Sequence, residues 1–160
     1  MIVVSNTSPL ISLYKVSCLD MLKSLFGEIR IPKAVYDEID VSKKDGKQIR
    51  KIIHSDKWIK IEQVYKIEKF RSCIDKGEAE VLMLAKEIKA DIVIIDNKEP
   101  REFAREYIPN TKIIGTIGII IEAYRKGLIE NPINKILELK EIGFYISEEM
   151  IRKIEYSIKR

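Results

Sequence analysis

The side chains that could do chemistry in this 160-residue chain are carboxylates. We interpret its one histidine, His54, as a solvated helix residue, because it lies in a lysine-rich stretch. The two cysteines, Cys18 and Cys73, follow no metal-binding spacing and do not predict a disulfide scaffold. These facts exclude a zinc site of the Cys/His kind and a histidine-based triad. Any bound metal must have oxygen ligands, which suit Mg²⁺ or Mn²⁺.

Two glutamates stand on apolar faces of predicted helices. Glu38 shares a helix face with Val35, and Glu78 shares one with Leu82. Glu80 lies on the opposite side of its helix, where we expect it to be solvated. A carboxylate on an apolar face must be ion-paired, hydrogen-bonded, protonated or metal-bound. The pattern therefore singles out Glu38 and Glu78.

Three further polar side chains stand where predicted strands end. Asn6 follows the first strand, Asp96 the most apolar one, and Thr116 the last. Ligands of parallel sheets bind at the carboxyl ends of the strands. Carboxylates gathered there repel one another and raise each other's pKa, and a divalent cation removes that penalty. Any one of these acids could instead be a helix cap or a surface charge, but the set favours a metal site.

The elements that must position these residues alternate along the chain. Apolar runs predict strands near 2–4, 28–31, 58–61, 92–95 and 112–114. Helical spacing predicts helices near 7–14, 18–26, 32–39, 44–54, 78–89, 99–107, 117–126, 132–141 and 148–159. We expect Thr7 or Ser8 to cap the first helix. This alternation predicts an α/β fold with a central, mainly parallel sheet in one domain of residues 1–160.

Composition narrows the class of protein. The chain is 46% hydrophobic and 34% charged, which is typical of a globular protein with a sizeable core. Its many isoleucines and lysines, with few glutamines, are typical of a hot-adapted source, a thermophile. No apolar run is long enough to span a membrane, and no cleavable signal pattern opens the chain. We therefore expect a soluble, cytoplasmic protein without membrane contact.

Positive charge is concentrated in residues 42–73. This segment holds ten basic and four acidic side chains, a net charge of +6, whereas the whole chain carries +4. The segment is either a solvated helical face or a patch that contacts phosphates. On the second interpretation, the candidate nucleic-acid-binding residues are Lys43, Lys44, Lys47 and Lys51.

Several stretches, in order along nearly the whole chain, resemble motifs of the PIN-domain superfamily. The resemblance is to a VapC-like branch of short prokaryotic proteins predicted to bind nucleic acids. An aspartate usually occupies the position of Asn6, while Glu38, Glu78 and Asp96 match the other acids, the last two 18 residues apart. The stretches are residues 4–11, 31–39, 75–80, 113–118 and 143–147.

The resemblance implies a single three-layer α/β/α PIN-like domain with a central, mainly parallel sheet. It also implies a metal-dependent ribonuclease that hydrolyses phosphodiester bonds within RNA, using Mg²⁺ or Mn²⁺. The implied partners are RNA, expected to be single-stranded, a small antitoxin protein that would make this chain the toxin of a pair, and a second copy in a homodimer. The implied catalytic residues are Glu38, Glu78 and Asp96, the metal ligands are these three with Asn6, and the supporting polar residues are Thr7, Ser8 and Thr116.

Asn6 keeps a rival interpretation open. An amide offers one carbonyl oxygen but no negative charge, so the chain could be a catalytically weak or inert PIN-like module that binds nucleic acid or protein. A second rival is an unrelated doubly wound domain that binds a nucleotide or acts as a phosphatase. The chain has no GxGxxG or GxxxxGK[ST] stretch, which counts against that alternative.

Overall fold

The computed structural model describes residues 1–66 and 74–159. In this part of the chain five strands form one all-parallel sheet in the order β3-β2-β1-β4-β5. The end of the basic segment, including Lys69, Arg71 and Cys73, lies outside the described residues. The strands are β1 (Val3–Ser5), β2 (Ile29–Pro32), β3 (Ile59–Glu62), β4 (Ile92–Ile94) and β5 (Lys112–Ile114).

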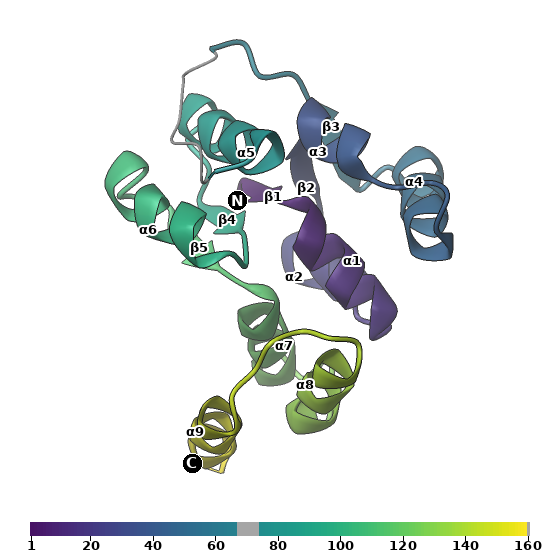
Figure 1. The fold of residues 1–160 in the computed structure, drawn as a ribbon, viewed down its shortest axis with the longest axis vertical. Helices are drawn as coiled ribbons and strands as arrows, with labels where there is room; N and C mark the ends of the chain where they lie inside the picture. The colour runs from purple at the N-terminus through teal and green to yellow at the C-terminus, as the bar shows by residue number, and fades with distance from the viewer. Residues whose placement is uncertain (67–73, 160) are drawn as a thin grey trace.

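Helices cover both faces of this sheet, which confirms the predicted α/β/α architecture (Figure 1). α5 packs on β1, β2 and β4, and α6 packs on β5. α2 contacts β2, and α4 contacts β3. α1 packs between α4 and α7. The helices are α1 (Thr7–Lys15), α2 (Asp20–Phe26), α3 (Lys33–Glu38), α4 (Lys44–Asp56), α5 (Lys76–Glu87), α6 (Lys98–Tyr107), α7 (Thr116–Arg125), α8 (Pro132–Glu141) and α9 (Glu148–Ile158).

The central strands are apolar because helices bury them on both faces. All three residues of β1 and all three of β4 are buried, and these strands pair in register from Val3 opposite Ile92 to Ser5 opposite Ile94. From β1 the chain passes first to β2 on one side and later to β4 on the other. The strand order therefore switches between β1 and β4, and their carboxyl ends flank the crevice where ligands of such sheets bind.

The first helix begins near the predicted position, but its cap differs from the predicted one. Asn6, not Thr7 or Ser8, occupies the cap position of α1, and its side chain makes no capping hydrogen bond. Thr7 and Ser8 lie within the helix, with Pro9 beside them in the first turn. The prediction of Thr7 or Ser8 as the cap was wrong because residue type alone does not locate the end of β1.

The C-terminal helices extend the fold beyond the sheet. α7 packs on α1 and α2, α8 on α7, and α9 on α8, so this part of the chain leads away from β5 (Figure 1). Side chains cap the last two helices: Asn131 accepts a hydrogen bond from the Asn134 amide, and Ser147 accepts one from the Met150 amide. No helix in the described residues is long and apolar enough to cross a membrane.

Candidate active site

The site begins with Asn6, at the carboxyl end of β1. Its backbone amide donates a hydrogen bond of 2.9 Å to the carbonyl of Ile94, which fixes it beside β4. Asn6 is only 4% exposed, and its Oδ1 atom has no hydrogen-bond partner among the described residues. Leaving a buried acceptor without a partner costs about 1–3 kcal/mol. Asn6 therefore presents an acceptor oxygen that a bound water or cation would satisfy.

Glu38 enters the site from the end of α3. Its Oε2 accepts a hydrogen bond of 2.8 Å from the hydroxyl of Thr7, 31 residues earlier in the chain. The residue as a whole is exposed, but its carboxyl group lies against Thr7 and Gly77. Desolvation raises the pKa of this carboxyl, the Thr7 hydrogen bond opposes the rise, and the charges of Asp75 and Glu78 add to it. Carboxylate crowding thus exists on this side of the site, as the sequence predicts.

Glu78 is the most deeply buried acid of the site, at 3% exposed. It forms a capping box with Asp75 at the start of α5: the Glu78 amide donates to Asp75 Oδ1 at 2.8 Å, and the Asp75 amide donates to Glu78 Oε1 at 3.1 Å. Its other oxygen, Oε2, accepts a hydrogen bond from the Asn97 side chain. These donors explain how a carboxylate remains on the apolar face of α5.

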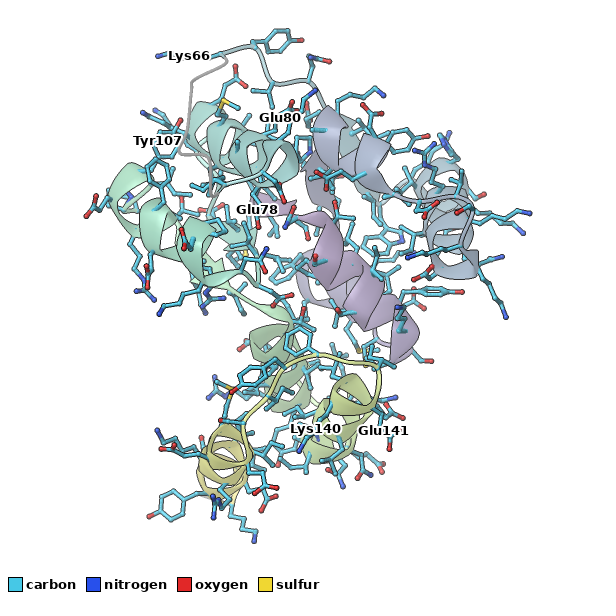
Figure 2. All side chains as sticks on the ribbon, in the orientation of Figure 1. Lys66, Glu78, Glu80, Tyr107, Lys140 and Glu141 are labelled. Carbon is cyan, nitrogen blue, oxygen red and sulfur yellow. The ribbon has the colours of Figure 1, made fainter. Side chains whose placement is uncertain are left out.

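Glu78 and Glu80 point to different parts of the molecule (Figure 2). Glu78 lies on the side of α5 that faces α1 and α6, whereas Glu80 lies toward α3. The expectation that Glu80 is simply solvated was wrong. Glu80 is half-buried and accepts a hydrogen bond of 3.3 Å from the Ala34 amide in the first turn of α3. Its carboxylate stabilises the amino end of that helix.

Asp96 joins the site from the loop after β4. Its two oxygens accept hydrogen bonds of 2.7 Å from Thr116, one from the backbone amide and one from the hydroxyl. Thr116 is fully buried at the start of α7, so Asp96 also stabilises the amino end of that helix. The guanidinium of Arg101 lies near the Asp96 carboxylate, because both are next to Gly115. A Cβ atom built on Gly115 would stand 2.8 Å from Asp96 Oδ1 and 2.9 Å from Arg101 Nη1.

The sequence reasoning missed Arg101, Asp75 and Asn97. The sequence alone places no basic residue beside the acids, yet Arg101 donates a hydrogen bond of 3.0 Å to the carbonyl of Ile95, next to Asp96. The turn from β4 into α6 brings this guanidinium back to the end of β4. Asp75 could have been found, because an aspartate three residues before a glutamate is the signature of a capping box.

The comparison with known protein families agrees with this geometry. A family model described as a PIN domain matches residues 2–160. The chain belongs to the PIN-domain family. PIN domains are generally nucleases that depend on divalent metal ions. Searches of curated proteins and of solved structures gave no significant match.

The donor set of this PIN domain fits a hydrated divalent cation better than a cage made only of protein ligands. Among residues 1–66 and 74–159, no three His, Cys, Asp or Glu side chains gather closely enough to hold one metal ion. In this arrangement Glu38 is hydrogen-bonded to Thr7 and Asp96 to Thr116. Mg²⁺ usually keeps several waters and needs only one or two protein carboxylates. The unpartnered oxygen of Asn6 suits such a site.

The remaining residues singled out by the sequence make no hydrogen bond to these acids in the part of the chain that the structure describes. Ser8 is exposed in the first turn of α1. Lys43 and Lys44 line a hollow of about 680 Å³ together with Tyr14 and Lys15, at the far end of α1 from Thr7. All four lysines are exposed: Lys44, Lys47 and Lys51 lie on α4, and Lys43 is its cap residue. Their binding to RNA stays a prediction.

Proposed function

We propose that this PIN domain is an endoribonuclease that hydrolyses single-stranded RNA with the help of Mg²⁺ or Mn²⁺. The observation that carries the proposal is the unpartnered, buried Oδ1 of Asn6 at the switch in strand order. The neighbouring strand β4 leads into Asp96, and Glu78 is buried on the α5 face that packs on these strands. Buried oxygen donors at a strand switch point support a site for a cation and a phosphate.

In this proposal each acid is held by a neighbour. Thr7 orients Glu38, Asn97 orients Glu78, and Thr116 orients Asp96 through the hydrogen bonds described above. Asn6 and these acids would hold the hydrated cation, one or two of the acids directly and the others through its waters, and a carboxylate oxygen would accept a proton from the attacking water. The bound cation supplies Lewis-acid activation of that water and stabilises charge on the phosphate. Supporting residues thereby fix the geometry before RNA arrives.

The resemblance to the VapC-like branch supports a more specific proposal. The chain would be the toxin of a toxin-antitoxin pair, would be inhibited by a small antitoxin protein, and would act in the cytoplasm as a homodimer. Co-expression with the product of a neighbouring short reading frame tests this proposal. Growth inhibition by the chain alone, relieved by the neighbour, is the expected result. Growth unaffected by the chain would contradict the toxin assignment.

The alternative is an inert module that binds RNA or protein without cutting. Two observations favour it: Asn6 lacks the charge of an aspartate, and no three carboxylates in the described part of the chain are placed to hold one metal ion. Calorimetric titration of Mn²⁺ into the metal-free protein separates the two functions. Tight binding supports the nuclease, whereas no measurable binding supports the inert module.

Cleavage of a mixed pool of single-stranded RNA in Mn²⁺ tests the nuclease directly. Asp96→Asn should abolish cleavage, because the amide keeps an acceptor for Thr116 but removes the negative charge. Glu99→Gln is the matched control, since Glu99 is an exposed acid in the first turn of α6. Full activity of Asp96→Asn would remove this residue from the site, and an inactive parent protein would contradict the function.

A further inference from the structure

A hollow of about 540 Å³ opens beside Asp96. Its walls are α6, the junction of β5 and α7, and the segment between α8 and α9. The candidate active site uses only its edge, at Asp96. Side chains that matter for binding are Lys98, Arg101 and Arg105 on one wall and Phe144 and Tyr145 on another. Glu102 lines the hollow too and forms an ion pair of 3.9 Å with Lys98, so the hollow combines two arginines outside that pair with aromatic rings.

The three cations share one face of α6. Lys98, Arg101 and Arg105 are spaced by three and four residues, which places them on one stripe of a helix. Arg101 is held against the Ile95 carbonyl, next to Asp96. Arg105 is exposed and makes no ion pair with any residue that the structure describes. The stripe therefore leads from the acid site outward, at a spacing that suits successive phosphates.

Tyr145 stands on the opposite wall with its side chain in solvent. The residue is 89% exposed, whereas Ile146, which follows it, is 5% exposed. Phe144, which precedes it, packs against the core. Gly143 has φ +97°, a conformation that other residues rarely adopt, and it turns the chain out of α8. Anchored neighbours thus hold an exposed aromatic ring at the edge of the hollow.

We propose that this hollow binds the RNA strand that leads away from the scissile bond. Arg101 and Arg105 would contact consecutive phosphates, and Tyr145 would stack on a base. The inference rests on the proposed function, because it places the scissile phosphate at Asp96. Cations that track a backbone, combined with an aromatic platform, are the common features of single-strand binding. An acidic peptide would use the cations but has no base to stack on Tyr145.

Binding without cleavage tests the proposal. Fluorescence anisotropy of a labelled single-stranded RNA is measured in EDTA over a range of salt concentrations. Arg105→Gln should reduce the slope of log affinity against log salt by about 0.7, the value for one phosphate contact on a single strand. Tyr145→Ala should weaken binding about tenfold, whereas Tyr145→Phe should bind like the parent, because a phenyl ring also stacks.

Two control variants match these changes elsewhere on the surface. Arg125→Gln removes an exposed arginine at the far end of α7, and Tyr156→Ala removes a tyrosine of α9 that is 64% exposed. Both should bind RNA like the parent. Equal midpoints of thermal unfolding for all variants would show that each is folded.

The outcomes separate this inference from the nuclease function. If the parent cuts RNA but Arg105→Gln and Tyr145→Ala bind like the controls, the inference is overturned and the nuclease stands. If the variants lose affinity as expected while no RNA is cut, the hollow binds single-stranded RNA but the nuclease falls, and with it the placement of a scissile bond at Asp96. If oligoglutamate binds as tightly as RNA, and equally well to Tyr145→Ala, the hollow binds an acidic peptide and the inference is wrong.

Discussion

Gly77 makes room for the carboxylate of Glu38. Gly77 lies in the first turn of α5, and a Cβ atom built there would overlap the Glu38 carboxyl oxygens. The Gly77 amide also donates a hydrogen bond to this carboxylate, which lowers the Glu38 pKa against the effect of desolvation. Two helices from distant parts of the chain therefore meet at a point where a side chain would displace an acid of the proposed site.

Gly77→Ala should separate stability from metal binding. The clash is with the end of a flexible side chain, so Glu38 can move away and the fold should survive. Alanine within a helix is favoured over glycine by about 0.5–1 kcal/mol, so the unfolding midpoint should stay equal or rise. The displaced carboxylate should nevertheless weaken Mn²⁺ binding, measured by calorimetry, by tenfold or more.

A double-variant cycle checks this explanation. If Gly77→Ala acts only by displacing Glu38, then adding it to Glu38→Ala should cause no further loss of Mn²⁺ affinity. Additive losses would show that Gly77 affects the metal through another route, such as the Asp75–Glu78 capping box that surrounds it.

Glu78 and Glu80 should respond differently to the same substitution. Glu78→Gln removes charge from a carboxylate buried in the site, and we expect a large loss of Mn²⁺ affinity. Glu80→Gln changes an acid at the start of α3, so it should cost at most about 1 kcal/mol of stability and leave Mn²⁺ affinity unchanged. Calorimetry with thermal unfolding measures both. Equal losses of Mn²⁺ affinity in the two variants would show that Glu78 is no more important for metal binding than Glu80.

The raised pKa of Glu38 predicts a pH dependence. Its ordinary value is about 4.5, and desolvation, with the charges of Asp75 and Glu78, raises the folded-state pKa above it. The folded state therefore binds more protons than the unfolded state between these two values, and stability falls as pH rises through this window. Glu38→Gln, which keeps an acceptor for Thr7, should lose less stability over the same window. Urea unfolding of both proteins from pH 4 to 7 measures the difference, and parallel curves would contradict it.

The sequence predicts the position of a residue of the candidate site where a helix or strand pattern alone determines that position. Glu78 could be predicted because helical spacing alone places it on the buried face of α5. Asp96 could be predicted because it follows an apolar strand. Arg101 could not, because the turn from β4 into α6 brings its guanidinium back to the Ile95 carbonyl, and the sequence pattern does not determine the course of that turn. The helix cap at Asn6 was missed for a related reason, since only the pairing of β1 with β4 shows where that strand ends.

Asn6 is the residue whose charge most directly tests the proposed nuclease. Its Oδ1 is buried and unpartnered, and it occupies the cap of α1 without capping it. Asn6→Asp keeps the shape and adds the negative charge that PIN domains resembling this chain usually carry. Asn131→Asp is the matched control, because Asn131 caps α8 through its Oδ1 and an aspartate caps equally well.

Asn6→Asp should raise Mn²⁺ affinity about tenfold, because one added anionic ligand in a poorly solvated cleft easily contributes about 1.4 kcal/mol. Any rate of RNA cleavage should rise with it. Without metal the new carboxylate repels the other acids, so the unfolding midpoint near neutral pH should fall below that of Asn131→Asp and recover when Mn²⁺ is added. Calorimetry and thermal unfolding, each with and without Mn²⁺, measure these effects. A variant that binds Mn²⁺ no better than the parent and is equally stable without it would show that Asn6 does not face the acids, and the inert binding module would then replace the nuclease.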